Sequence, residues 1–363
     1  MTRSQMTKYP GGKVAELRVL ANLTADAALT AAPDRQITVL EAAKRLQDIA
    51  DGLERRKKKA LEQPVVAELP ANATADEIHH SRRRQATRVG SEVYLPGWSA
   101  TARALPNAFL RSALFAAARG VQADNANLLA GGSACLVSEE KIGTFQNMTL
   151  TFSGHGLCQF DRLVYSTCLE YYRETPLCPE ERPRYERTTF YEFARRMGNK
   201  YSAKAHSAIR ASLLRLSFAQ VHIRQERMDI EVPKLMSVKF EGADSAENFK
   251  GSDVLLLRVT TPVAELFGAG AWTAVDNEAA GYDGLKGWVA NFYAGHAHPK
   301  PLPVELLHKI SGYASNKWNF KASLIRALEK LKDLSTPACS RVASFHFCED
   351  DNKIYVVRSA WVA

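Results

Sequence analysis

Two stretches of the sequence carry lysine, arginine, serine and asparagine at helical spacing. In proteins that bind DNA, side chains of these types hold phosphate and read base edges. The first stretch covers residues 202–216 together with the lysine just before it. The side chains that we predict to contact DNA here are Lys200, Lys204, Ser207, Arg210 and Arg215. In the helical repeat most of them lie opposite an apolar stripe, with Arg210 on the flank. Because arginine can make two hydrogen bonds to one guanine, we expect a DNA-binding helix here in which Arg210 reads a base.

The second stretch, residues 317–331, has the same organisation. The side chains that we predict to contact DNA here are Lys317, Asn319, Lys321, Arg326 and Lys330. Asn319 and Arg326 face outward, and the three lysines lie on the shoulders. Asparagine pairs with adenine and arginine with guanine, so these two residues are predicted to read bases while the lysines hold phosphate. The exposed side of an ordinary helix carries the same residue types, and that interpretation stays open.

Apolar residues at intervals of three and four predict the buried side of each helix. They are Ala205, Ile209, Leu213 and Leu216 in the first helix, and Phe320, Leu324, Leu328 and Leu331 in the second. Each helix follows a glycine-containing turn and precedes an expected β-hairpin. The hairpin after the first helix, formed by residues 220–225 and 234–240, adds Arg224 and Arg227 as expected DNA contacts. These two residues fit an inert solvent-facing strand equally well.

The charge of the chain points to an anionic partner. The 363 residues include 48 Lys and Arg against 39 Asp and Glu, a net charge of +9. Residues 182–227 contain 11 basic and 3 acidic residues, and residues 296–332 contain 7 basic and 2 acidic residues. Both clusters coincide with the two helical stretches. This pattern favours double-stranded DNA as the partner.

Patterns that predict catalysis are weak. His296 and His298 match the metal-binding histidine pair of rolling-circle nickases, but Pro299 and Pro301 predict a loop where a nickase has a strand. Residues 8–13 (KYPGGK) resemble the opening of one class of adenine-N6 DNA methyltransferases, yet the Asp/Asn-Pro-Pro-Tyr/Phe tetrapeptide of that chemistry is absent. The six cysteines form no Cys-x-x-Cys pair. We expect no enzyme, no cofactor, no metal and reduced thiols.

The apolar runs of the sequence are too short to cross a bilayer, and the first residues lack the apolar core of a secretory signal. We therefore expect a cytoplasmic protein with no membrane contact. Residues 1–93 are rich in alanine and have one aromatic residue, Tyr9, a composition that predicts a flexible basic tail. One amphipathic helix is predicted within it, over about residues 38–62, because apolar residues there follow heptad spacing.

The order of predicted elements repeats in the rest of the chain. A helix, a second helix, a turn, a third helix and a hairpin occur in residues 94–250 and again in residues 251–363. The predicted fold class is α+β, with tandem winged-helix domains, each a helix-turn-helix plus a β-hairpin, after a mostly disordered basic N-terminal tail. Residues 105–119 are expected to hold a capped helix.

Five blocks of the sequence are similar to the TrfA family of plasmid replication initiators. They are residues 104–107 (ALPN), 111–115 (RSALF), 150–154 (LTFSG), 169–171 (LEY) and 189–192 (TFYE). Weaker similarity extends the resemblance over roughly residues 95–363. The combination of RSALF and TFYE is specific enough to make a chance match unlikely.

The resemblance implies a bacterial protein that binds direct repeats, called iterons, at a plasmid origin and opens the adjacent AT-rich DNA. It also implies recruitment of the host initiator and the replicative helicase, and exchange between active monomers and inactive homodimers that helps to control copy number. A two-domain winged-helix transcriptional repressor would share every feature of the residues themselves. The sequence departs from the family where a Gln-Leu-x-Leu-Phe sliding-clamp motif can occur, since residues 91–98 contain no glutamine.

Overall fold

The computed structural model describes residues 12–62, 65–117, 136–145, 147–177, 179, 184–225, 228–242, 246–296, 299–348 and 352–359. The chain forms two compact units, residues 1–64 and residues 65–363. Each unit has its own packing and is described separately. No helix within the described ranges is long and apolar enough to cross a membrane.

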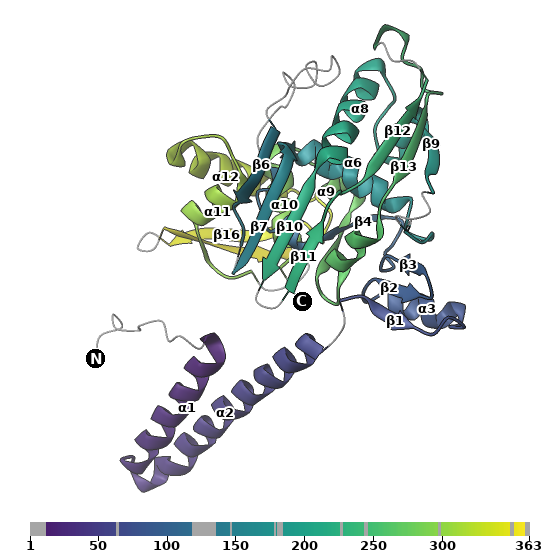
Figure 1. Ribbon diagram of the computed structural model, residues 1–363. Helices are drawn as coiled ribbons and strands as arrows, with labels where there is room; N and C mark the ends of the chain where they lie inside the picture. Colours follow the sequence, from purple (N-terminus) through teal and green to yellow (C-terminus); the bar gives the residue numbers. More distant parts are fainter. Residues whose placement is uncertain are drawn as a thin grey trace. The chain divides into compact units, whose positions relative to one another are not determined.

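The first unit is a helical hairpin of α1 (Gly12–Leu29) and α2 (Pro33–Glu62) (Figure 1). Small side chains form the contact between the helices, since Ala21, Ala28, Ala43 and Ala50 are buried. A salt bridge spans the two helices, because Arg18 Nη2 lies 3.1 Å from Asp51 Oδ1 and 2.5 Å from Glu54 Oε2.

The prediction of a mostly disordered tail is wrong, because this region is mostly helical. The heptad pattern indicated α2, but α1 was missed because its large apolar residues are spread around the helix and mark no single side. Helix α2 also begins earlier than predicted, at Pro33, where the missing N–H of proline costs no hydrogen bond. The tail was expected to reach residue 93, whereas residues 65–94 belong to the larger unit.

The larger unit is a mixed α+β structure with several small sheets. Its first part is a small sheet crossed by one helix. The elements are β1 (Ala67–Leu69), α3 (Ala75–Arg82), β2 (Thr87–Val89) and β3 (Glu92–Tyr94). Next come β4 (Ala102–Pro106), α4 (Asn107–Leu110) and β5 (Phe115–Ala116). The helix expected after Pro106 is therefore a single turn, because the chain becomes extended again at Phe115 to pair with β8 (Leu157–Cys158).

The first module, residues 159–258, contains three helices and a three-stranded sheet. The helices are α6 (Gln159–Glu170), α7 (Phe190–Arg196) and α8 (Ala203–Phe218). The strands are β9 (Glu186–Thr189), β12 (Ser237–Glu241) and β13 (Val254–Arg258), in the order β12-β13-β9. The short helix η1 (Ala246–Asn248) lies in the β12–β13 connection.

The predicted hairpin of residues 220–225 with residues 234–240 is wrong. Strand β10 (Gln220–Gln225) pairs with β11 (Met228–Val232) and β7 (Met148–His155), whereas β12 pairs with β13. Strands β11, β10, β7 and β6 (Leu136–Ile142) form a separate four-stranded sheet (Figure 1). The β10–β11 hairpin is thus inserted between α8 and the β12–β13 hairpin of the first module. Strand β13 ends at Arg258, beyond the boundary predicted after residue 250.

A connecting segment joins the two modules. It follows β13 and contains η2 (Thr261–Phe267), β14 (Trp272–Asp276) and α9 (Asn277–Ala280). Strand β14 pairs with β4, which ties this segment to the start of the larger unit.

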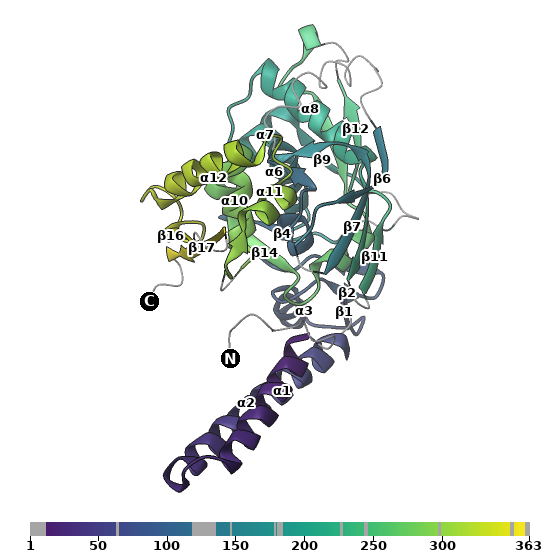
Figure 2. The ribbon, with the colours of Figure 1, turned by 90° about the vertical axis from the view of Figure 1, so that its left-hand side faces the viewer.

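The second module, residues 284–359, repeats the order of the first. Its elements are α10 (Gly284–Ala294), β15 (Leu302–Pro303), α11 (Val304–Ser311), α12 (Lys317–Lys332), β16 (Val342–Cys348) and β17 (Lys353–Arg358). The strand order β15-β17-β16 matches β9-β13-β12 in the first module. Trp288, Phe292, Phe320 and Leu324 belong to a separate hydrophobic core. Figure 2 shows the helices α10, α11 and α12 of this module.

A buried arginine joins the modules. The Arg162 guanidinium on α6 donates to Asn291 Oδ1 at 2.9 Å and to the carbonyl oxygens of Ala280 at 2.8 Å and Tyr282 at 3.3 Å. Its Nε donates to Gln159 Oε1 at 2.7 Å. Burial lowers the pKa of Arg162 to about 10, so it remains cationic at neutral pH.

A second buried cation fixes α8 to α6. Asp161 is fully buried, and its Oδ1 lies 2.6 Å from Arg215 Nη2 and accepts a hydrogen bond from Ser212 Oγ at 2.6 Å. Its Oδ2 accepts the N–H of Cys158 at 2.9 Å, at the start of α6. One carboxylate therefore caps α6 and anchors α8.

Replacing Arg215 by alanine would leave the Asp161 carboxylate buried without its cation. We expect Arg215→Ala to lower the free energy of unfolding by about 3–5 kcal/mol in urea denaturation. Lys204→Ala, on the exposed side of the same helix, is the control and should change it by less than about 0.5 kcal/mol. Equal effects of the two substitutions would contradict the assignment.

Candidate nucleic-acid interface

The turn that leads into α12 is fixed by sequence. Helix α11 ends at Gly312, whose φ of 60° is in the left-handed region that favours glycine. A Cβ at this position would lie 2.9 Å from the Cβ of Ala116. Four residues later the Asn316 side chain caps α12 by accepting the N–H of Asn319 at 2.9 Å. The start of α12 is therefore set on both sides of the turn.

Helix α12 has a buried side and a charged side, as predicted. Phe320, Leu324, Leu328 and Leu331 are fully buried. Lys317, Asn319, Arg326 and Lys330 are exposed, and Lys321 is half-buried. The structure thus brings all five residues predicted on this stretch to one accessible helix.

Several of these side chains have partners within the protein. Lys317 Nζ lies 2.5 Å from Glu305 Oε1 on α11, and this hydrogen bond holds the pKa of Glu305 below its usual value. Arg326 Nη2 donates to Ser323 Oγ at 3.0 Å, which aligns the guanidinium along the helix. The ammonium of Lys321 lies 4.9 Å from the ring centroid of Phe347 on β16. These contacts hold the cations near the exposed surface of α12.

Sequence reasoning missed one residue of this surface. Trp318, the second residue of α12, is 85% exposed, although tryptophan is usually largely covered. It lies two residues before the fully buried Phe320, and so on the opposite side of the helix. That offset was the signal in the sequence that could have identified it.

The first module presents a similar but smaller surface. The Thr189 side chain and Glu192 form a capping box at the start of α7, and Ser202 caps α8 by accepting the N–H of Ala205 at 3.1 Å. Lys200 and Lys204 are exposed, and Ser207 is half-buried. These three residues lie together at the N-terminal end of α8.

Aromatic side chains surround the middle of α8. The Arg210 guanidinium lies 4.2 Å from the ring centroid of Phe240 on β12 and 5.7 Å from that of Phe249. One turn earlier, His206 is stacked between Phe190 and Phe249, with ring centroids 3.5 Å and 4.0 Å away. Burial lowers the pKa of His206 to about 4, so this histidine is neutral at pH 7 and adds no charge to the surface. Arg210 is thus held against Phe240 and Phe249 of its own module.

The prediction that Arg215 faces outward is wrong. Its exposed fraction is 1%, because it pairs with Asp161 behind the helix. Helical spacing alone placed it opposite Ile209 and Leu213, but α8 is covered by α6 on that side near its C-terminal end. Arg215 is therefore a structural cation and does not belong to the candidate interface.

The two remaining predicted residues lie elsewhere. Arg224 is exposed on β10, with its Nε 3.4 Å from Asp229 Oδ2 on β11. It therefore belongs to the four-stranded sheet and not to the wing of the first module. Arg227 lies outside the described residues.

His296, one of the two histidines that match the nickase pair, bonds to the backbone of its own segment. It is half-buried and makes a 2.7 Å hydrogen bond through Nδ1 to the carbonyl oxygen of Phe292, and burial lowers its pKa to about 4. His298 lies outside the described residues. Within the described ranges no group of three or more His, Cys, Asp or Glu side chains could hold a metal ion.

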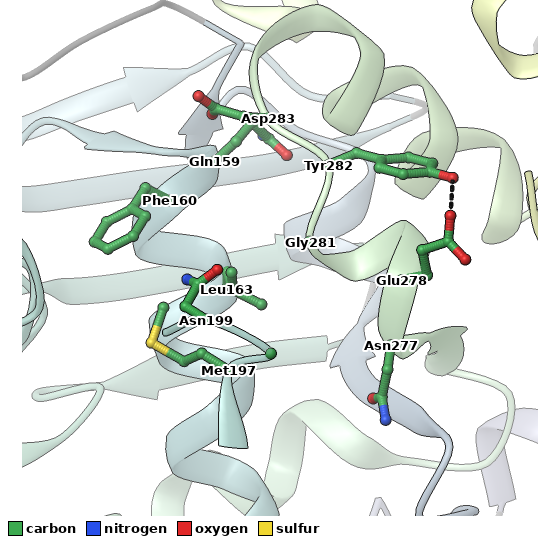
Figure 3. Close-up of a pocket in the computed structure, with 11 residues that line it drawn as sticks. Gln159, Phe160, Leu163, Met197, Asn199, Asn277, Glu278, Gly281, Tyr282 and Asp283 are labelled. Atoms are coloured by element: carbon green, nitrogen blue, oxygen red, sulfur yellow. Dashed lines mark hydrogen bonds between the residues drawn. The ribbon is translucent and has the colours of Figure 1, made fainter. Parts of the chain in front are cut away.

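A cavity of about 320 Å³ lies between α6, the turn after α7, and α9 (Figure 3). Phe160, Leu163 and Met197 lie on one side of it, and Glu278 lies on the other, where it accepts a hydrogen bond from the Tyr282 hydroxyl at 3.1 Å. Among the described residues, the side chains that line it include no lysine, arginine or histidine, so this lining offers no cation for phosphate.

Comparison with solved structures gives low similarity. A crystal structure of domains 2 and 3 of RctB, as a selenomethionine derivative, has 13% sequence identity and a TM-score of 0.39, covering 62% of this chain and 90% of that chain. A second crystal structure of RctB domains 2–3 has 13% identity and a TM-score of 0.33, covering 56% of this chain and 79% of that one. No curated protein matches the sequence.

The sequence matches a family model described as TrfA protein over residues 57–336. The matched range includes α8, α11 and α12, the helices on which the candidate interface is built. Members of this family are plasmid replication initiators, which are generally non-catalytic DNA-binding proteins. Because the model covers more than half of the sequence, the chain belongs to the TrfA family of plasmid replication initiator proteins.

Proposed function

We propose that this initiator binds direct repeats in the duplex DNA of its plasmid origin through two winged-helix modules. In this proposal α8 and α12 are the recognition helices and enter successive major grooves, about 10 bp apart on one face of the duplex. The wings are the β12–β13 hairpin of the first module and the β16–β17 hairpin of the second.

The surface of α12 is the observation that carries the proposal. A recognition helix needs an apolar side that fixes it to its domain and a polar side that reaches the bases. Helix α12 has four fully buried apolar residues on one side, and Asn319 and Arg326 exposed on the other. Asn319 and Arg326 are the proposed base-reading residues, and Lys317, Lys321 and Lys330 the proposed phosphate contacts.

Helix α8 supports the proposal over its N-terminal half. Lys200 and Lys204 are exposed there and can reach phosphate, and Ser207 lies one turn further along. Arg210 has its cation against Phe240, so in this proposal it reads a base only through the edge that it turns away from the ring. Arg224 and Arg227 remain proposed DNA contacts outside the recognition helices.

The steps that follow binding belong to the same proposal. Occupied repeats open the adjacent AT-rich DNA, and the bound initiator recruits the host initiator and the replicative helicase in the bacterial cytoplasm. A homodimer is proposed as the inactive form. Family membership supports these steps, since it is the property that separates an initiator from a two-domain repressor.

A plasmid replication assay distinguishes an initiator from a two-domain repressor. A plasmid that carries the DNA flanking the gene, together with the gene itself, is expected to replicate in a host that lacks other means of maintaining it. The same plasmid encoding Arg326→Ala should be lost or reduced in copy number. If footprinted sites coincide with a promoter while the plasmid fails to replicate, the chain is a repressor.

Two substitutions on α12 separate base reading from phosphate contact. Arg326→Ala should weaken binding to the repeat by about 1–3 kcal/mol and relax preference at one base pair. Lys330→Ala should weaken binding equally for all sequences. The control is Arg88→Ala, which removes an exposed arginine from β2, far from α12 in the sequence. Affinities are measured by fluorescence anisotropy, and a uniform loss with Arg326→Ala would make this residue a phosphate contact.

The salt dependence of binding tests the number of phosphate contacts. If six to ten phosphates are neutralised, affinity should fall roughly 10³- to 10⁵-fold between 50 and 200 mM salt. Lys317→Ala should reduce the slope of log affinity against log salt concentration by about 1, which corresponds to the loss of one phosphate contact. A flat salt response would contradict the proposed interface.

A further inference from the structure

Trp318 is the least covered large apolar side chain among the described residues of the second module. Its exposed fraction is 85%, whereas Trp288 of the same module is 2% exposed. A tryptophan has one of the largest apolar surfaces of any side chain, and leaving it in water forfeits the free energy of burying that surface. The exposed indole therefore indicates a binding partner that covers it.

The position of Trp318 within α12 limits what that partner is. Asn316 is the N-cap, so Trp318 is the second helical residue and lies in the first turn. Ala322 and Arg326 follow at intervals of four, which places them on the same side of the helix, and both are exposed. The N-terminal residues of a recognition helix are those that contact base edges in the major groove.

We infer that Trp318 is a specificity-determining residue that packs its indole against the C5-methyl group of a thymine in the major groove. The inference rests on the proposed function, since it requires α12 to be a recognition helix. Thymine is the one base that presents a methyl group in this groove. The small side chain of Ala322, one turn further on, leaves room for the base edge.

The neighbouring asparagine fits the same base pair chemistry. Asn319 follows Trp318 directly, is exposed, and has the amide that pairs with N6 and N7 of adenine. An A·T pair offers the adenine edge and the thymine methyl group together. The juxtaposition of Trp318 and Asn319 therefore predicts an A·T pair, or two successive A·T pairs, under the first turn of α12.

The surroundings of Trp318 favour DNA over a protein partner. Protein-docking patches are contiguous apolar surfaces. Here Lys317 and Asn319, next to Trp318 in the sequence, are exposed and polar, and the exposed Arg326 lies about two turns further along the same side of α12. The thymine methyl group is an apolar group in a groove bordered by phosphates. A single apolar side chain within a cationic surface is complementary to it.

Replacement of thymine by deoxyuridine removes only the methyl group and so tests the contact directly. The full-length protein is titrated with duplexes that carry its footprinted repeat, each with one thymine replaced by deoxyuridine. For the native protein we expect about a fourfold loss of affinity at one or two positions, which corresponds to the burial of one methyl group. With Trp318→Ala those positions should lose their sensitivity, while the unmodified repeat binds about 10-fold more weakly.

Two further variants serve as controls. Trp318→Phe retains an aromatic ring and should keep part of the sensitivity to deoxyuridine. Leu334→Ala removes a side chain that is 81% exposed just beyond the other end of α12, and should leave both affinity and sensitivity unchanged. Urea denaturation of each variant reports whether folding is intact.

The possible outcomes are distinguishable. If Trp318→Ala binds more weakly but keeps the native deoxyuridine pattern, the indole contacts the backbone and the inference is wrong. If DNA affinity is unchanged and only self-association or protein binding is lost, Trp318 belongs to a protein interface and the inference is again wrong. If the native protein shows no preference for any repeat, the proposed function itself fails.

Discussion

The buried guanidinium of Arg162 is the constraint on which the arrangement of the two modules depends. A cation in the interior is costly unless its donors are satisfied, and Arg162 meets this condition with Gln159, Asn291 and two backbone carbonyls. Those carbonyls belong to Ala280 and Tyr282, in the chain between α9 and α10, so the start of the second module is fixed to α6. Gly287 lets α10 approach the same turn closely, since a Cβ there would lie 2.1 Å from the Tyr282 carbonyl oxygen.

Fixing α10 to α6 has a direct effect on the candidate interface. Helix α12 packs against α10, and α8 is held to α6 through Asp161. Each of the two charged helices is therefore connected to the same helix, α6, by buried contacts. The modules are one structure with two exposed helices, and the angle between those helices is a property of the fold. Under the proposed function, repeats with a different groove spacing would have to be accommodated by deforming the DNA.

The sequence was sufficient for the second module because each signal there was local. The stripe from Phe320 to Leu331 and the succession of three helices and a hairpin were predicted, and the structure confirms them. It adds the short strand β15, which no pattern predicted. The first module was harder, because the β10–β11 hairpin separates α8 from the strands β12 and β13, so the hairpin that follows α8 in the sequence is not the one formed by β12 and β13. Arg215 was misplaced for a related reason: its buried partner, Asp161, is distant in the sequence. Trp318 was missed because the stripe was used only to identify the core.

Asp161 also determines how the first module can change during evolution. The C-terminal half of α8 supplies Ser212 and Arg215 to this carboxylate, and Asp161 in turn caps α6. Because substitutions at these positions would disturb two helices at once, the target preference proposed for α8 can change only through its first two turns, around Lys204 and Ser207. Grafting a foreign recognition helix onto this scaffold would succeed only as a chimera that retains the native second half.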